Sequence, residues 1–222
     1  MYAINECANH TQDYCKSGNY WKTLHAWDEC VAFSTGSLEG QDGRGDGNLV
    51  YNLADEQCLE WKTCGPHGNS SVGTSKVNID TRELLKIGQA QIRDNKCLET
   101  DDTKKQIAQK WYIPLIQGTM SCAYKLFISR SKEIEAKCAT LAAAVLPRIH
   151  NASATAATTI YDNVKVGALL TDYLGVWSAF ESVYSALNVS SIDIGTYQYT
   201  KAPTKRPTKK PTKKPTKKPK KK

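Results

Sequence analysis

The sequence has no run of about 18 apolar residues, the length that a membrane-spanning helix requires, and its mean hydropathy is −0.51. Strict alternation of apolar and polar residues, the pattern of a half-buried strand, is also scarce and is present only weakly, at Val72–Ile79. These absences exclude a transmembrane helix and argue against a β-sheet protein. The 40% hydrophobic content is nevertheless sufficient for a folded domain with its own core.

The chain also lacks the short motifs of common catalytic sites, with no nucleophile elbow, no HExxH pair and no phosphate-binding loop. Among its four histidines, His25 lies one helical turn from Asp28, but its apolar neighbours are more typical of a half-buried packing residue than of a catalytic base. We therefore expect neither an enzyme nor a cofactor. Four tryptophans at helical spacing are expected to be core residues: Trp21, Trp27, Trp111 and Trp177.

Eight cysteines are present, but no two have the Cys-x-x-Cys spacing with which zinc sites usually present two thiolates to one metal. An even number of cysteines without close pairs favours four disulfides over metal binding, and free buried cysteines are the alternative. Spacing alone does not select the pairing. The disulfide candidates are Cys7, Cys15, Cys30, Cys58, Cys64, Cys97, Cys122 and Cys138.

Four N-glycosylation sequons agree with an oxidising, extracellular compartment, and their asparagines are Asn9, Asn69, Asn151 and Asn188. The first residues, Met1–Glu6, contain neither the basic nor the apolar segment of a signal peptide. We interpret the chain as a mature or trimmed form of a secreted or cell-surface protein. The alternative is an intracellular protein with reduced cysteines.

Apolar residues recur at steps of three and four over Ile113–Val145, apart from one gap of seven across Ser131, and again over Ile160–Leu187. This is the period of one helix face. A turn at Pro147–Ser153 would join the two helices into an antiparallel hairpin about 45 Å long. Because an apolar stripe must be buried, we predict an all-α, disulfide-stapled helical bundle built on this long hairpin.

The side chains of Phe127 and Leu170 belong to the two predicted stripes and are expected to be buried. Shorter helices are predicted upstream, one of them with Asp80 as its N-cap. Their ranges are Asn19–Phe33, Leu53–Cys64, Thr81–Arg93 and Thr103–Tyr112. The glycine-rich stretch Ser34–Leu49 is expected to be an exposed loop.

This loop contains the adhesion tripeptide Arg44, Gly45 and Asp46, flanked by glycine on both sides. Integrin recognition requires an exposed guanidinium and carboxylate on a tight turn, and such a loop can present both, so Arg44–Asp46 is a candidate receptor contact. A plain polar surface loop is the alternative. A calcium loop is a third interpretation, although Arg44 occupies one of its ligand positions and Leu53 replaces the bidentate glutamate.

The C-terminal tail differs sharply in charge from the rest of the chain. Residues 201–222 hold 12 of the 30 lysine and arginine residues and no acidic residue, so the other 200 residues carry 18 basic against 22 acidic side chains, a net charge of −4. A proline at every fourth position blocks helix formation, and the like charges repel one another. We predict a cysteine-rich helical domain at 1–200 and a disordered Lys/Pro/Thr tail at 201–222.

The repeated Pro-Thr-Lys-Lys unit of the tail resembles the Thr/Pro/Lys-rich tails of secreted diatom cell-surface and silica-associated proteins. It is also similar to the Lys/Pro/Ala-rich tails of linker histones, in which the order is Ser/Thr-Pro-Lys-Lys, whereas proline precedes threonine here. The first resemblance implies an extracellular, anionic surface as the partner, and the second implies DNA.

A dense cationic tail binds polyanions because each neutralised anion releases a condensed counterion. The candidate residues are Lys205, Arg206, Lys209, Lys210, Lys213, Lys214, Lys217, Lys218, Lys220, Lys221 and Lys222. We therefore expect a secreted or cell-surface structural or interaction protein whose tail tethers it to an anionic polymer or surface, such as polysaccharide, silica, phosphorylated protein or membrane. The alternative is an intracellular nucleic-acid-binding protein that uses the same tail.

Overall fold

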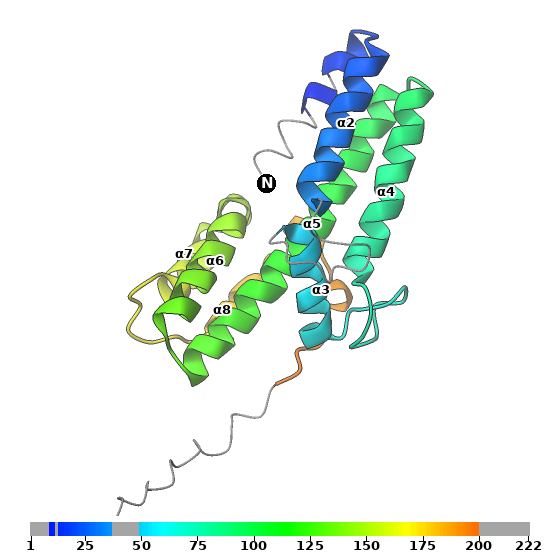
Figure 1. The fold of residues 1–222 in the computed structure, drawn as a ribbon. Coiled ribbons are helices and arrows are strands. Elements are labelled where there is room, and N and C mark those ends of the chain that lie inside the picture. The colour runs from blue at the N-terminus through cyan, green and yellow to red at the C-terminus, as the bar shows by residue number, and fades with distance from the viewer. Residues whose placement is uncertain (1–8, 12, 37–48, 200–222) are drawn as a thin grey trace, which may run out of the picture.

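The computed structural model describes residues 9–11, 13–36 and 49–199, which form an all-α fold as predicted (Figure 1). Within these ranges no strand forms, and two isolated bridges from Cys64 are the only β-type pairing. The helices are α2 (Tyr20–Thr35), α3 (Val50–Trp61), α4 (Lys76–Arg93), α5 (Cys97–Ile128), α6 (Lys132–Ala152), α7 (Ala154–Val164), α8 (Tyr173–Glu181), η1 (Ser185–Leu187) and α9 (Ser191–Ile194). None of these helices is both long and apolar enough to cross a membrane.

Helix α5 runs through the whole body and belongs to both of its cores (Figure 1). With 32 residues, it is about 48 Å long. Its first half packs with α2 and α4 around a small core of five buried residues: Trp27, Leu85, Ile92, Ile107 and Trp111. Its second half packs with α3, α6, α7 and α8 around a larger core whose bulkiest fully buried members are Trp61, Phe180, Ile116, Met120, Ile149 and Ile160.

The long two-helix hairpin is not the basis of the fold, because both predicted helices are divided. The first ends at Ile128, turns through residues 129–131 and resumes as α6, whose N-cap Ser131 accepts a hydrogen bond from the Ile134 amide at 3.2 Å. The second is interrupted by a loop at residues 165–172 between α7 and α8. Four successive helices, α5 to α8, therefore fold back on one another. The turn predicted at Pro147–Ser153 is the single residue Ser153, which lies between α6 and α7 and is the N-cap of α7.

These breaks place two residues at the surface that the periodicity assigns to the core. Phe127, next to the last residue of α5, is 59% exposed, and Leu170, in the loop before α8, is 86% exposed. Two prolines lie inside helices: Pro114 is in the middle of α5, and Pro147, where the predicted turn begins, is inside α6, which continues to Ala152. Packing on neighbouring helices thus stabilises both helices despite the hydrogen bond that each proline removes.

Side-chain caps explain where most of the helices begin. Ser75 caps α4 by accepting a hydrogen bond from the Asn78 amide at 3.0 Å. The predicted strand Val72–Ile79 is therefore a loop followed by the first turn of α4. The prediction of Asp80 as N-cap is also wrong, since Asp80 lies inside this helix. The other N-caps that accept hydrogen bonds through their side chains are Asn19, Ser131, Ser153, Asp172 and Ser190.

The end of the described chain lies against the end of α3. The amide of Thr196 donates to the carbonyl of Trp61 at 3.0 Å, and the amide of Gln198 donates to the carbonyl of Glu60 at 2.7 Å. Between them, the buried ring of Tyr197 contacts the rings of Trp61 and Trp177 at centroid distances of 5.0 and 5.7 Å. Backbone and ring contacts together fix this segment to the body.

Candidate ligand-binding pocket

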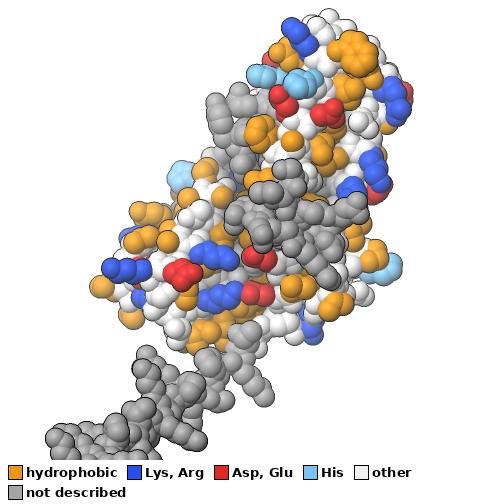
Figure 2. All heavy atoms as spheres, in the orientation of Figure 1, with side chains coloured by type: hydrophobic (Ala, Val, Ile, Leu, Met, Phe, Trp, Pro, Cys, Tyr) orange, Lys and Arg blue, Asp and Glu red, His pale blue; other side chains and the backbone are white. Residues whose placement is uncertain are grey.

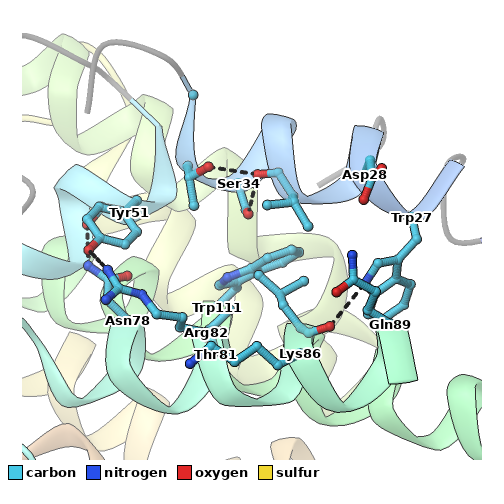
Figure 3. Close-up of a pocket in the computed structure, with 14 residues that line it drawn as sticks. Trp27, Asp28, Ser34, Tyr51, Asn78, Thr81, Arg82, Lys86, Gln89 and Trp111 are labelled. Atoms are coloured by element: carbon cyan, nitrogen blue, oxygen red, sulfur yellow. Dashed lines mark hydrogen bonds between the residues drawn. The ribbon is translucent and has the colours of Figure 1, made fainter. Parts of the chain in front are cut away.

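A cavity of about 430 Å³ lies between α2 and α4 (Figure 3). Trp111 of α5 lies between the two helices, and Tyr51 in the first turn of α3 lies at one end. Pockets of this size, lined by aromatic side chains and a few polar groups, are typical of small-molecule binding sites. The cavity is therefore the candidate functional site of the body.

The apolar end of the pocket is built by the close approach of α2 to α4. The indole N–H of Trp27 donates to the carbonyl of Leu85 at 3.1 Å, which fixes the orientation of a ring that is 2% exposed. This approach requires glycine at position 88 of α4, because a Cβ there would lie 2.1 Å from Cζ2 of Trp27. Trp27, Leu85 and Trp111 thus form a rigid apolar wall.

The opposite end of the pocket is polar and is held by a network that joins α3 to α4. The side-chain amide of Asn78 donates to the carbonyl of Tyr51 at 2.8 Å and to Oδ1 of Asp55 at 2.7 Å. The same carboxylate oxygen accepts the amide of Ser75 at 2.7 Å, and the guanidinium of Arg82 donates to the hydroxyl of Tyr51 at 3.0 Å. In Figure 3, Tyr51, Asn78 and Arg82 lie at one end of the pocket and Trp27 lies at the other.

One polar atom in the pocket wall has no partner. Thr81 is 6% exposed, and its Oγ1 atom is buried and makes no hydrogen bond. Leaving a buried hydroxyl unpaired costs about 1–3 kcal/mol. Thr81 lines the cavity, but its Oγ1 has almost no surface open to it.

The rim of the pocket carries charges of both signs. Asp28 projects from α2, and Arg82 and Lys86 lie one turn apart on α4. Lys86 is also paired with Glu83, at 2.8 Å between Nζ and Oε1, and both side chains are mostly exposed. The rim therefore favours neither an anion nor a cation strongly.

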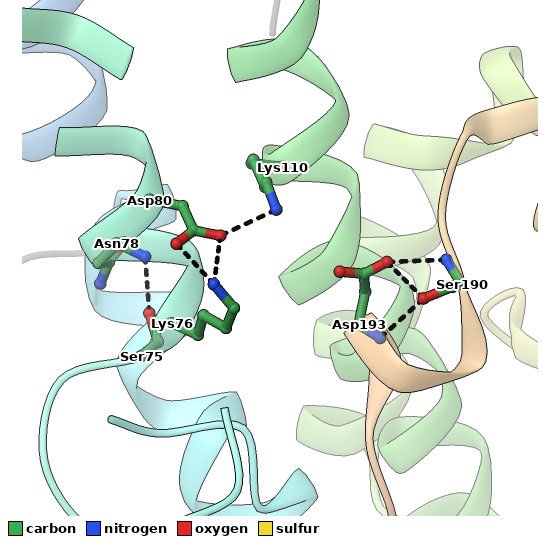
Figure 4. Close-up of polar contacts among 7 residues, drawn as sticks. All are labelled: Ser75, Lys76, Asn78, Asp80, Lys110, Ser190 and Asp193. Carbon is green, nitrogen blue, oxygen red and sulfur yellow. Dashed lines mark hydrogen bonds and ion pairs between the residues drawn. The ribbon is translucent and has the colours of Figure 1, made fainter. Parts of the chain in front are cut away.

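Helix α4 is fixed against α5 by a cluster of ion pairs around Asp80 (Figure 4). Asp80 accepts hydrogen bonds from Nζ of Lys76 at 2.7 and 2.9 Å and lies 2.9 Å from Nζ of Lys110, which belongs to α5. Partial burial opposes ionisation of this carboxyl, but the two lysines outweigh it and hold the pKa of Asp80 below its ordinary value of 3.8. At the N-terminal end of α9, the N-cap Ser190 and Asp193 form a reciprocal capping box (Figure 4).

The predicted disulfides are confirmed wherever the structure describes them. Cysteines pair as Cys15–Cys97, Cys58–Cys64 and Cys122–Cys138, and Cys30 is also disulfide-bonded. Among the described residues no cysteine is free, and no cluster of three or more histidine, cysteine or carboxylate side chains could hold a metal. Cys7 lies outside the described residues.

The other predicted site residues are dispersed or lie outside the described ranges. All four sequon asparagines, Asn9, Asn69, Asn151 and Asn188, are exposed, and Asn151 lies in the last turn of α6. The adhesion tripeptide at 44–46 and the calcium-loop alternative fall in residues 37–48, outside the described part of the chain. The polyanion-binding candidates of the tail, at 201–222, are likewise outside it.

Two further expectations for single residues are wrong. His25 is exposed rather than half-buried and pairs with Glu29, at 3.3 Å between Nε2 and Oε1, instead of orienting with Asp28. Trp21 is 76% exposed, whereas Trp27 and Trp111 are buried as predicted and Trp177 is half-buried. The sequence did not predict the pocket, because its walls come from four helices. The one local signal was the glycine at position 88, which lies in an otherwise apolar helix face and allows Trp27 to approach α4 closely.

Comparison with known proteins adds no relative to this description. No family model matches the chain, and neither a curated protein nor a solved structure is significantly similar to it.

Proposed function

We propose that this protein is a secreted or cell-surface interaction protein whose cationic tail tethers its folded body to an anionic matrix or surface. The observation that carries the proposal is the separation of charge along the chain. Twelve basic residues are concentrated in residues 201–222, while the remainder has a net charge of −4. In the view of Figure 2, the basic and acidic side chains of the described body are interspersed.

The physical basis of the tether is the release of counterions. Each sulfate, phosphate or silanolate that a lysine neutralises releases a condensed cation, so affinity rises with the number of contacts and falls steeply as salt is added. A chain with proline at every fourth position and no acidic residue has no internal partner for its charges. Its lysines therefore remain available to a polymer of opposite charge, without selection for sequence or shape.

The cysteines support an extracellular location. Disulfides persist in oxidising compartments and are rare where glutathione keeps thiols reduced, and every described cysteine of this body is disulfide-bonded. The exposure of all four sequon asparagines is compatible with N-glycosylation. These features favour an extracellular polyanion, such as an acidic polysaccharide or silica, over DNA as the partner.

The test is a salt series of binding to heparin, silica and duplex DNA. We expect the wild-type chain to bind all three, with log affinity falling linearly with log salt concentration. A full-length variant in which all twelve basic tail residues are replaced by glutamine should lose binding to all three. The control replaces three exposed basic residues of the body, Lys62, Arg93 and Lys132, by glutamine and should retain it.

Three results would change the conclusion. Undiminished binding by the glutamine-tail variant would place the site in the body. A strong preference for DNA at equal charge density would support the intracellular, nucleic-acid-binding alternative. Recovery of the native protein from its source with free thiols would contradict the extracellular location.

A further inference from the structure

The loop between α7 and α8 exposes three large apolar side chains. Val166, Leu169 and Leu170 are 65%, 94% and 86% exposed, and Leu174 in the first turn of α8 is 57% exposed. Together these four residues are the apolar tip of the body. A cluster of exposed apolar side chains on a folded protein is typical of a surface that contacts a partner.

Hydrogen bonds hold this loop in one conformation. The hydroxyl of Thr171 accepts a hydrogen bond from the guanidinium of Arg130 at 2.7 Å and donates to the carbonyl of Asn163 at 2.9 Å. The amide of Asp172 donates to Oδ1 of the same asparagine at 2.6 Å, and Ala168 is buried. The two leucines between these fixed points are therefore presented to the outside by the fold of the loop.

The tail leaves the body beside the apolar tip. The ring of Tyr199, the last described residue, contacts the ring of Tyr124 at a centroid distance of 5.1 Å, and Tyr124 contacts Tyr173 at 5.3 Å. Tyr173 directly precedes Leu174 of the tip. In Figure 1 the α7–α8 loop and the end of the described chain both lie in the lower part of the body. The twelve basic residues of 201–222 therefore begin close to the exposed leucines.

Charged side chains beside the loop pair with one another. Nζ of Lys165 lies 2.6 Å from Oδ1 of Asp162, and Nη1 of Arg130 lies 3.1 Å from Oε1 of Glu135. Because these charges balance within each pair, they give the tip no strong attraction for an anion. The tip thus contributes apolar contact, and the tail contributes positive charge.

Apolar side chains next to a dense positive charge match the surface of an anionic bilayer. A bilayer has an apolar layer beneath its charged headgroups, and binding there increases with the apolar area buried and with the attraction to anionic lipids. Polysaccharide and silica attract the tail but have no such layer for the leucines. A second copy of the chain, bound at the same end, would bring two tails of like charge together.

We propose that the apolar tip inserts into the interface of an anionic lipid bilayer while the adjacent tail binds the headgroups. Leu169 and Leu170 leave water for the boundary between headgroups and acyl chains, and the lysines release the counterions of the lipid phosphates. This inference rests on the proposed tether function and names the anionic surface as a lipid membrane. It also gives the body a fixed orientation on that surface, with the end of α5 toward the lipid.

Co-sedimentation with vesicles tests the role of the leucines. The vesicles are an equimolar mixture of phosphatidylcholine and phosphatidylglycerol, and the protein is the full-length, oxidised chain. Replacing both leucines, Leu169→Ser/Leu170→Ser, should weaken vesicle binding about tenfold or more, because two apolar side chains no longer leave water. Vesicle binding as tight as that of the wild type would overturn the proposal.

A matched control removes an exposed leucine from the opposite end of α5. Leu98, the second residue of that helix, is 76% exposed, and Leu98→Ser should bind vesicles as the wild type does. All three leucines are exposed, so neither variant should change the thermal unfolding temperature. Equal weakening by Leu98→Ser and by the double serine variant would show that the effect is not specific to the tip and would overturn the proposal.

Heparin separates a failure of this inference from a failure of the tether. The double serine variant should bind heparin as the wild type does, because its tail is intact, whereas the variant with a glutamine tail should lose binding to heparin and to vesicles. If the glutamine-tail variant keeps its affinity for heparin, the tether function is wrong. If it loses that affinity while the double serine variant binds vesicles like the wild type, the tether stands and only the membrane inference is wrong.

The salt dependence gives a second signature. The affinity of each protein for vesicles should fall as salt is added, because the tail is screened. The ratio of wild-type to double-serine affinity should stay constant over the salt range in which both bind, because burial of the leucines does not depend on charge. A ratio that falls to one with added salt would contradict insertion of the tip.

A fluorescent reporter tests the depth of the tip. In Leu170→Trp, brominated acyl chains should quench part of the added tryptophan emission, whereas the added tryptophan of Leu98→Trp should not be quenched. Equal quenching in the two variants would overturn the proposal. Analytical ultracentrifugation without lipid tests the remaining occupant: a wild-type dimer that the double serine variant dissociates, with vesicle binding unchanged, would assign the tip to a second copy of the chain instead.

Discussion

The six-membered ring of Trp27 occupies the space that a side chain at Gly88 would need. A Cβ at position 88 would lie 2.1 Å from Cζ2 and 2.4 Å from Cη2 of Trp27, distances at which atoms cannot coexist. Helix α2 therefore approaches the backbone of α4 directly, and the apolar end of the pocket depends on this contact.

This contact reverses the usual effect of replacing glycine by alanine in a helix. The change normally stabilises a helix by about 1 kcal/mol, but Gly88→Ala should destabilise the protein by about 1–3 kcal/mol because it overpacks the contact. In a Trp27→Leu background, which lacks the ring, the same change should cost little. A double-mutant cycle measured by urea unfolding checks this, and additive effects would show that the two residues are not coupled.

The three described disulfides should differ in their effect on stability because they close loops of different length. Cys15–Cys97 spans 82 residues, whereas Cys58–Cys64 spans 6. In the chain-entropy account, replacing both cysteines of the first pair by alanine costs about 4–5 kcal/mol, and replacing the second pair costs about 2 kcal/mol. Thermal unfolding of the two double variants gives the order, and a reversed order would rule out loop closure as the dominant effect.

The cluster around Asp80 should make the protein sensitive to acid. Because the pKa of Asp80 is lower in the folded than in the unfolded chain, its contribution is fully present above the ordinary value of 3.8 and is lost as the pH falls through the folded-state pKa. Asp80→Asn should cost about 1–2 kcal/mol at pH 7. The difference from the wild type should shrink below pH 4.

Urea unfolding of both proteins from pH 7 to pH 2.5 measures this difference. Asp162→Asn, which removes an exposed pair with Lys165, is the control and should change stability little at any pH. A constant difference between Asp80→Asn and the wild type across the range would contradict the assigned role of the cluster.

Two phenylalanines on predicted apolar stripes should respond very differently to truncation. Phe180 is fully buried in the larger core, and Phe127 is 59% exposed at the end of α5. Phe180→Ala should cost about 3–5 kcal/mol, and Phe127→Ala should cost less than about 1 kcal/mol. Calorimetry of both variants checks where the helix breaks. Similar costs would indicate that Phe127 is buried and that the helix continues through residues 129–131.

The sequence was sufficient for the fold class and for most helix faces, because helical periodicity is a local property. It failed where local signals compete. The gap of seven across Ser131 marked a real break, but the stripe on either side of it masked the turn. Pro147 suggested a helix end, but packing keeps it inside α6, as it keeps Pro114 inside α5.

The pocket could not be predicted for a different reason. In its apolar wall, Trp27 donates a hydrogen bond to the carbonyl of Leu85, 58 residues away. The Thr81 hydroxyl is unpaired because the packed helices place no hydrogen-bonding group within its reach. Neither property is encoded in the spacing of neighbouring residues. The tail, in contrast, was interpreted from composition alone, because counterion release depends on the number of charges rather than on a fold.

The attachment of the last described residues to α3 has a mechanical consequence for a tethered protein. Tension applied through the tail would act first on the two amides at Thr196 and Gln198 that donate to carbonyls of α3, and on the ring of Tyr197 buried between them. Cys58, in the same helix, is covalently joined to Cys64 just beyond the helix end. This segment would therefore act as an anchor that passes a pulling force into a cross-linked part of the core. The α2–α4 pocket, which lies at the other end of α3, would be outside the line of load.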